Sequence, residues 1–227
     1  MPTALALFLA SAAGLGDLGP VPADAVRVYL VRHGQAFSNL DPTPDLPPEK
    51  LDRLTATGVG QAERAGRALR GRGIRVVLSS PAGRARETAD AMGRLLDARE
   101  VRVEPRLRPL ELGRSDTGQP LDWDARIAFW KDGRDPSPPG GESLADVGGR
   151  VLDLVKSLRP EHRGGSVVLV AHSEVIGSFV GLVGRVPPAR RYPPQIDNAS
   201  ITVVDMADWP LLLLTSHVPA EAKAPAP

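Results

Sequence analysis

The chain has 227 residues, of which 42% are hydrophobic and 24% charged, a composition that is ordinary for a globular protein and gives no indication of disorder. Its formal net charge of +1 provides no electrostatic reason to bind nucleic acid or a membrane surface. The sequence contains no cysteine, which excludes disulfides, thiolate catalysis and cysteine-ligated metal sites.

The first 25 residues differ from the rest of the sequence. The apolar run from Thr3 to Leu15 is too short for a membrane span of about 20 residues, but it has the length of the apolar part of a signal peptide. Ala23-Asp24-Ala25 resembles a signal-peptidase site, although no lysine or arginine precedes the apolar run. Two alternatives stay open: a cleaved leader on an exported protein, periplasmic or secreted, or a disordered leader on a cytoplasmic one.

One folded domain is expected from residue 26 to 218, with an Ala- and Pro-rich solvated tail at 219 to 227. Apolar, β-branched runs predict strands at 26 to 31, 74 to 80, 166 to 172, 200 to 206 and 210 to 218. Helical periodicity predicts helices at 58 to 71, 82 to 96 and 142 to 158, the last with Ser143 and Asp146 as a capping pair. This alternation predicts an α/β fold: three layers, with a mainly parallel sheet flanked by helices.

A long segment from about 107 to 141 interrupts the alternation. It is rich in Pro, Gly and Asp, and we expect an insertion over one edge of the sheet, of the kind that often forms a lid or binding loop. Its aromatic residues, Trp123, Phe129 and Trp130, are interpreted as a packing cluster.

Reactive or cationic residues follow three of the predicted strands. Arg32 and His33 follow the first strand, Arg84 lies shortly after the second, and His172 ends the third. Ligands of open parallel sheets bind at the carboxyl ends of the strands, so these four side chains are expected to converge on one pocket.

Two histidines and two arginines in one pocket suit a phosphate-like oxyanion. The guanidinium fork binds phosphate bidentately, and a neutral imidazole nitrogen can attack phosphorus and carry the phosphoryl group. Gly34 is expected to let the backbone approach the phosphate closely. This chemistry needs no cofactor and no metal, and none is expected. A weaker alternative is a metal-dependent hydrolase with His33 and His172 as ligands.

Five stretches resemble the histidine phosphatase superfamily, in its phosphoglycerate mutase-like branch. They are LVRHGQAFSN (30 to 39), DRLTATGVGQA (52 to 62), SSPAGRARETA (79 to 89), GGES (140 to 143) and VLVAHSEVI (168 to 176), in the family's order. With DNASITVV at 197 to 204 as the last core strand, the resemblance covers about residues 26 to 205.

The resemblance implies a role for each matching residue. His33 is the nucleophile that becomes phosphohistidine, while Arg32, Arg84 and His172 hold the phosphoryl oxygens. Asn39 matches a phosphate-contacting asparagine, and Gln35 matches a position that orients more than it reacts. Glu142, in the GES motif, is expected to be structural.

The chain departs from the family pattern at the proton donor. Family members usually carry a glutamate four residues before a glycine, but here Pro109 holds that place before Gly113. Glu111 is the favoured replacement, because a carboxyl on a Pro-flanked, apolar stretch is easier to keep protonated, and Asp116 is the reserve. Ser173 also replaces the glycine that often follows the second histidine, so the resemblance does not predict the structure of the pocket wall beside His172.

The resulting hypothesis is a phosphatase that hydrolyses phosphoric monoesters through His33, acting on a small phosphorylated substrate or a phosphoprotein. No nucleic acid partner and no stable membrane insertion are expected. A phosphomutase is the nearest alternative, because it differs only in the acceptor of the phosphoryl group. A catalytically inactive member that binds phosphorylated ligands is a further alternative, supported by Pro109.

Overall fold

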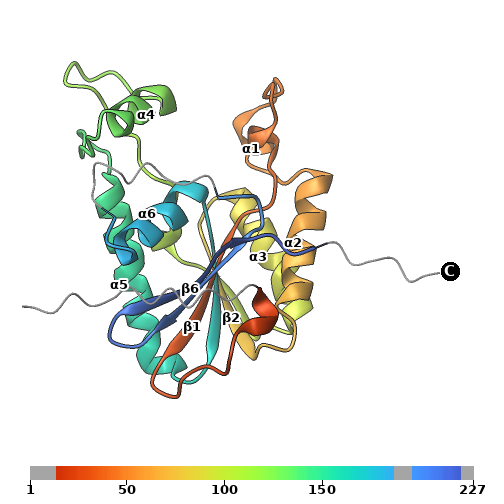
Figure 1. Cartoon of the computed structure of the whole chain (residues 1–227). Helices are drawn as coiled ribbons and strands as arrows, with labels where there is room; N and C mark the ends of the chain where they lie inside the picture. The colour runs from red at the N-terminus through yellow and green to blue at the C-terminus, as the bar shows by residue number, and fades with distance from the viewer. Residues whose placement is uncertain (1–13, 187–195, 221–227) are drawn as a thin grey trace, which may run out of the picture.

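The structure is a computed structural model that describes residues 14 to 186 and 196 to 220. Its described residues form one six-stranded sheet in the order β3-β2-β4-β1-β5-β6 (Figure 1). The strands are β1 (Val26–Arg32), β2 (Ile74–Ser79), β3 (Glu100–Val103), β4 (Ser166–Ala171), β5 (Ile201–Met206) and β6 (Pro210–His217). The four strands β1, β2, β3 and β4 run parallel to one another, whereas β5 is antiparallel to both β1 and β6. The expected α/β fold with a mainly parallel sheet is confirmed.

Helices cover both faces of the sheet and complete three layers. The helices are α1 (Pro48–Leu51), α2 (Ala56–Ala68), α3 (Gly83–Leu96), α4 (Trp123–Lys131), α5 (Leu144–His162) and α6 (Ser173–Val183). Short 3-10 turns lie at η1 (Leu15–Asp17), η2 (Phe37–Asn39) and η3 (Pro105–Leu107). α5 and α6 pack on one face and α2 and α3 on the other (Figure 1).

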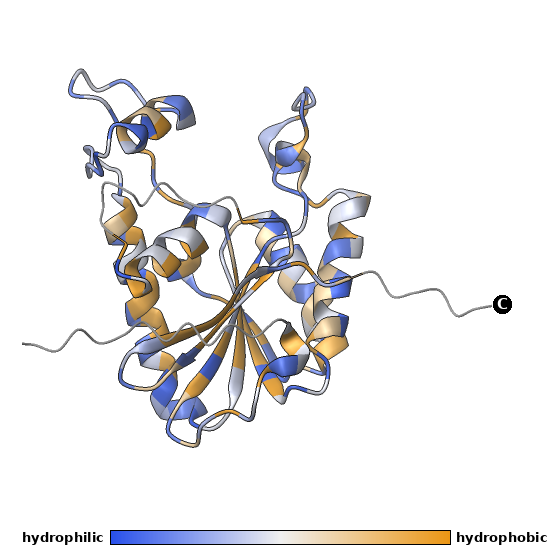
Figure 2. Ribbon diagram, viewed as in Figure 1, coloured by the Kyte–Doolittle hydropathy of each residue, from blue (hydrophilic) through white to orange (hydrophobic). Residues whose placement is uncertain are grey.

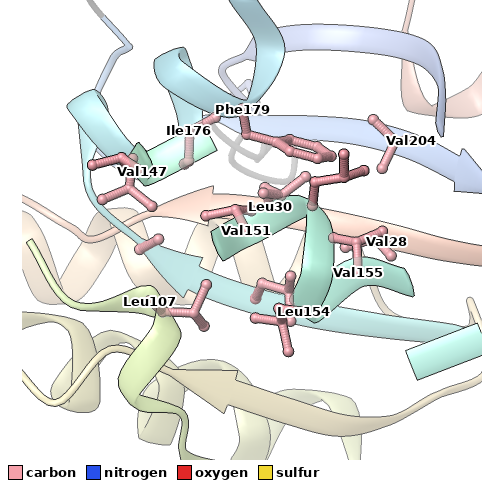
Figure 3. Close-up of a cluster of buried hydrophobic side chains, with 14 of the residues drawn as sticks. Val28, Leu30, Leu107, Val147, Val151, Leu154, Val155, Ile176, Phe179 and Val204 are labelled. Carbon is pink, nitrogen blue, oxygen red and sulfur yellow. The ribbon is translucent and has the colours of Figure 1, made fainter. Parts of the chain in front are cut away.

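The alternation of side chains along β1 explains how one strand serves two cores. Val28 and Leu30 pack with α5 and α6, and Tyr29 and Val31 pack on the opposite face with α2 and α3. Figure 3 shows the first of these clusters, in which Val28 and Leu30 lie among side chains of α5 and α6. Hydrophobic residues accordingly gather along the strands and the inner sides of the helices (Figure 2). A strand apolar on both faces can only be central, which is where β1 and β4 lie.

The five predicted strands and three predicted helices are present, with ends shifted by a few residues, and Ser143 caps α5 through the Asp146 N–H at 3.0 Å. The sequence patterns did not predict β3, α1, α4 or α6. All four residues of β3 are exposed, because it is an edge strand, so it shows no apolar run. α6 is apolar on nearly every side, so the helical period is weak there.

Residues 14 to 25 pack on the domain, although the sequence analysis placed them in the leader. Leu15 is buried and its carbonyl accepts a hydrogen bond from Arg72 at 2.8 Å, while Arg27 donates to the Gly19 carbonyl at 2.7 Å. Packing therefore begins before the expected boundary at residue 26. The rest of the predicted leader, 1 to 13, and most of the predicted tail, 221 to 227, lie outside the described residues. Among the described helices, none has the length and apolarity to cross a bilayer.

The insertion at 107 to 141 contains α4, which the side chain of Asp122 caps by accepting the Ala125 N–H at 2.8 Å. Arg126 of α4 is fully buried and donates to the carbonyls of Leu112, Pro136 and Glu142. Trp130 is buried and packs as expected. Trp123 is 42% exposed, so the predicted aromatic cluster is buried only in part. α4 and α1 project beyond the same end of the sheet on opposite sides (Figure 1).

Candidate active site

The expected convergence at the strand ends is present. β4 lies between β1 and β2, so the residues that follow these three parallel strands are neighbours. The His33 N–H donates to the Ala171 carbonyl at 3.0 Å, which fixes the exit of β1 beside His172. The two imidazole rings lie 5.2 Å apart, centroid to centroid, at an interplanar angle of 59°.

The His33 ring is buried, and its hydrogen bonds define its tautomer. Nδ1 lies 2.8 Å from the Gly34 carbonyl oxygen, which can only accept, so Nδ1 carries the proton. Nε2 accepts a hydrogen bond from Arg84 Nε at 3.1 Å. The lone pair that could attack a phosphorus atom is therefore on Nε2, on the side of the ring that faces Arg84.

His172 is held in the opposite sense. Its Nδ1 lies 3.2 Å from Arg84 Nη2, and a guanidinium can only donate, so Nδ1 is the acceptor. Nε2 then carries the proton and donates to Ser80 Oγ at 2.7 Å. A single guanidinium thus touches both imidazoles, and Ser80, directly after β2, fixes the orientation of the second ring.

Asp52 orients Arg84. One carboxylate oxygen accepts from Arg84 Nη1 at 2.5 Å, and the other accepts the Gly83 N–H at 2.6 Å. The carboxylate thereby holds both the guanidinium and the first turn of α3, which carries it. Asp52 leaves the other two nitrogens of the guanidinium directed at the histidines.

Two side-chain nitrogens of Arg32 differ in their hydrogen bonding to the described residues. Nη1 donates to the Ile196 carbonyl, while the buried Nε has no partner among the described residues. Burial lowers the pKa of Arg32, but a guanidinium remains protonated at any working pH. Ser173 Oγ accepts the Ile196 N–H at 3.1 Å, so the serine that replaces the family's glycine supports the same wall.

Burial and positive neighbours keep both histidines neutral. Burial, followed by the charge of Arg84, lowers the pKa of His33 to about 3. Burial, the nearby His33 and Arg84 hold the pKa of His172 well below its ordinary value. At neutral pH the site therefore combines two permanent cations with two uncharged rings, an arrangement suited to an anion attacked by an imidazole nitrogen.

Comparison with known families agrees with this geometry. The family model of the histidine phosphatase superfamily, branch 1, matches residues 28–215. The chain belongs to the histidine phosphatase superfamily. The matched range contains all four converging side chains, Arg32, His33, Arg84 and His172, and all of the described sheet except the first two residues of β1 and the last two of β6.

Known proteins of several kinds resemble this histidine phosphatase chain. A probable phosphoglycerate mutase, GpmB, of Yersinia enterocolitica is 27% identical over 82% of this chain and 88% of its own length. A solved mycobacterial glucosyl-3-phosphoglycerate phosphatase, in complex with VO3, is 30% identical with a TM-score of 0.64, covering 82% of this chain and 95% of its own. YhfR of Bacillus stearothermophilus is 25% identical with a TM-score of 0.67, covering 86% and 98%.

Gly34 allows a close approach that the sequence analysis did not anticipate, and its expected place beside the phosphate stays a prediction. Its N–H already donates to Thr88 Oγ1 at 3.0 Å, and a Cβ at this position would lie 2.3 Å from the Gly58 carbonyl oxygen. The missing side chain allows the turn after β1 to pack against the first turn of α2. The close approach is therefore to the protein's own backbone, and it fixes the position of His33.

Gln35 and Asn39 are both held by hydrogen bonds beside the histidine turn. Gln35 Oε1 accepts from Thr55 Oγ1 at 2.9 Å. Asn39 Oδ1 accepts the Ala36 N–H at 3.0 Å and faces Asn198 Nδ2 at 3.4 Å. The expected contacts of these two side chains with phosphate stay a prediction.

The sequence-based proton donors are exposed. The side chain of Glu111 is 60% exposed, with its carboxylate 3.9 Å from Arg108 Nε, and Asp116 is also exposed. The apolar surroundings expected for Glu111 are absent, since its side chain is exposed while its neighbour Leu110 is buried in the core. Glu142 is structural as expected, since it binds Arg108 and Arg150, each at 2.8 Å.

Sequence reasoning missed three residues that hold or border the site, Asp52, Ser80 and Glu174. All three lie inside motif stretches that pointed to the family, but their partners became visible only in the fold. Glu174 follows His172 by two residues, at the start of α6, and its pKa is raised by burial. Among the described residues, no three His, Asp or Glu side chains form a group that could hold a metal ion.

Proposed function

We propose that this chain is a phosphatase that hydrolyses phosphoric monoesters through a phosphohistidine at Nε2 of His33. The observation that carries the proposal is the orientation of His33: Nδ1–H is fixed on the Gly34 carbonyl, so the lone pair is on Nε2, where it accepts a hydrogen bond from Arg84 that an incoming phosphoryl group would replace. An imidazole held in this way is a nucleophile whose attacking atom is already selected.

The arginines supply the charge that the reaction needs. As Nε2 attacks phosphorus, negative charge concentrates on the phosphoryl oxygens, and preorganised cations stabilise it. Arg84 reaches both rings, and Arg32 has a buried nitrogen that no described residue partners. In the second step water attacks phosphorus, the P–N bond breaks, and its electron pair returns to Nε2 of His33.

A small phosphorylated metabolite is the proposed substrate class. The resemblance to a glucosyl-3-phosphoglycerate phosphatase supports a small substrate over a phosphoprotein, which stays an alternative. No nucleic acid partner is proposed, since the net charge of +1 gives no basic surface excess.

A phosphomutase is the second candidate, because relatives such as GpmB are described as probable phosphoglycerate mutases. The two reactions share the phosphohistidine and differ in whether water or a second hydroxyl takes the phosphoryl group. Incubation with 3-phosphoglycerate, followed by phosphorus NMR, separates them: free phosphate indicates a phosphatase and a shifted phosphomonoester indicates a mutase.

The direct test is to trap the intermediate. Wild-type protein exposed briefly to p-nitrophenyl phosphate and quenched should carry an acid-labile, base-stable phosphate on His33. His33→Ala should lose both the adduct and turnover, and His217→Ala on edge strand β6 is the matched control that should keep both. Turnover retained by His33→Ala contradicts the proposal. Binding of phosphate without any adduct would instead identify an inactive, ligand-binding member.

A further inference from the structure

The proposed reaction requires a proton at the leaving oxygen, and the chain lacks the usual residue to provide it. Pro109 stands where family members usually carry a glutamate. The carboxylates near it in sequence, Glu111 and Asp116, are exposed to solvent. Neither carboxyl is buried as the two histidines are.

A different carboxyl lies beside the vacant position. Glu174 is in the first turn of α6, two residues after His172. Its Oε1 accepts the N–H of Leu110 at 3.4 Å, and Leu110 directly follows Pro109. Two segments 64 residues apart therefore meet here, and the carboxyl of Glu174 borders the backbone position from which the family's glutamate would extend.

The surroundings of Glu174 favour a carboxyl that can hold a proton. Burial raises the pKa of Glu174, and this effect exceeds the opposing influence of the Leu110 N–H and of the cations Arg84 and Arg32. A bound phosphate dianion would neutralise those two cations and so weaken the interaction that favours the carboxylate. Substrate binding thus promotes protonation of Glu174.

We propose that Glu174 is the proton donor to the leaving oxygen, an inference that rests on the proposed phosphatase function. As Nε2 of His33 bonds to phosphorus, the P–O bond breaks, its electron pair goes to the leaving oxygen, and this oxygen takes the proton of Glu174. The resulting carboxylate then takes a proton from the attacking water as the P–N bond breaks. Glu174 ends protonated and His33 ends neutral, so the cycle closes.

A purely structural role for Glu174 makes a different prediction. An acidic residue in the first turn of a helix interacts favourably with the helix dipole, and that is sufficient reason for a glutamate at this place. Such a residue affects stability and acts equally on all substrates. A proton donor, by contrast, matters most when the leaving group is a strong base.

Glu174→Gln separates these roles, because the amide oxygen can still accept the Leu110 N–H while the side chain can no longer transfer a proton. We expect kcat/KM for phenyl phosphate to fall about 10²- to 10⁴-fold, the usual contribution of a general acid. For p-nitrophenyl phosphate, whose leaving group is a much weaker base, we expect a far smaller loss. Phosphohistidine should accumulate, because the second step also loses its base.

The matched controls are Glu111→Gln and Asp116→Asn, which should leave the ratio between the two substrates unchanged. Equal losses on both substrates in Glu174→Gln, or the leaving-group effect in Glu111→Gln instead, would overturn the proposal. If Glu174→Gln does not fold, Glu174→Asp is the second variant. It should keep a basic limb in its pH profile with a lowered rate on phenyl phosphate, and an unchanged rate overturns the proposal.

The same experiments distinguish this inference from the proposed function. If Glu174 is not the donor, the wild type and Glu174→Gln still form phosphohistidine from p-nitrophenyl phosphate. If the proposed function is wrong, the wild type itself forms no adduct on His33.

Discussion

The ends of β1, β2 and β4 hold the reacting groups through buried hydrogen bonds, whereas residues 107 to 141 border the same end of the sheet with many of their polar side chains exposed. His33 and His172 are almost fully buried and each ring nitrogen has a partner. In the insertion, Glu111, Asp116 and Trp123 face solvent. The difference indicates that the phosphoryl chemistry is set by the sheet, and that the insertion is free to adapt to the rest of a substrate.

The strongest test of this comparison is Arg84→Lys. An ammonium cannot donate to both imidazoles and Asp52 from one plane, so kcat/KM for p-nitrophenyl phosphate should fall about 10²- to 10³-fold, as for the loss of one preorganised donor. Arg114→Lys in the insertion is the matched control and should change kcat/KM little, because the Arg114 side chain is exposed and, among the described residues, donates to the Gly118 carbonyl alone. Similar losses in both variants would erase the distinction between the two regions.

Asp52→Asn tests whether orientation of Arg84 matters in its own right. The amide offers one oxygen in place of two, so either the Gly83 N–H or the Arg84 guanidinium loses its acceptor. We expect kcat/KM to fall about 10- to 100-fold, the usual effect of removing a supporting partner. Steady-state kinetics on p-nitrophenyl phosphate measure this, and wild-type values would show that Arg84 is held without Asp52.

Arg126→Met tests the insertion separately. The variant removes the donor shared by the Leu112, Pro136 and Glu142 carbonyls, which should cost about 1 to 3 kcal/mol of unfolding free energy. Urea unfolding measures the loss, with Arg114→Met as an exposed control. Phosphohistidine formation should persist in the folded variant, and its disappearance would show that the insertion shapes the chemistry as well.

The buried rings also predict a dependence of stability on pH. The pKa of His33 is about 3 in the folded protein against 6.5 for an ordinary histidine, so the unfolded chain binds more protons between these values. Stability is therefore fully present above pH 6.5 and falls as the pH drops toward 3, by about 1.4 kcal/mol per pH unit for this group. Urea unfolding at pH 7.5 and 5.5 measures it, and His33→Asn should show a smaller difference. Equal free energies of unfolding at the two pH values would contradict a lowered pKa of His33 in the folded protein.

The residues at the ends of β1 and β4 were predictable because the patterns that mark them are local in the sequence. An apolar run followed by Arg32-His33-Gly34 marks a central strand and its exit, and the same holds for His172 after β4. The sheet rule then brings these residues together. The insertion was not predictable in this way: Arg126 bonds three carbonyls from separate stretches, and α4 lacks a clear apolar face because its buried side includes a guanidinium.

Glu174 differs from both regions, because its position was evident in the sequence but its surroundings in the fold were not. Its place after His172 could be read from the sequence, but its hydrogen bond with the Leu110 N–H, in a distant segment, could not. Glu111 was favoured because its neighbours in sequence are apolar. In the fold, however, its side chain is exposed to solvent and lies beside Arg108. Local composition therefore predicts strands better than it predicts the protonation of a carboxyl.

The fork of Arg84, shared between two neutral rings, has a consequence for the end of the catalytic cycle. The positive charge that receives a phosphomonoester is still in place after hydrolysis, and liberated orthophosphate carries the same oxygens that the arginines recognise. The product phosphate therefore competes with the substrate for the same arginines. We expect orthophosphate to inhibit competitively, because it would occupy the same arginines as the phosphoryl group of a substrate.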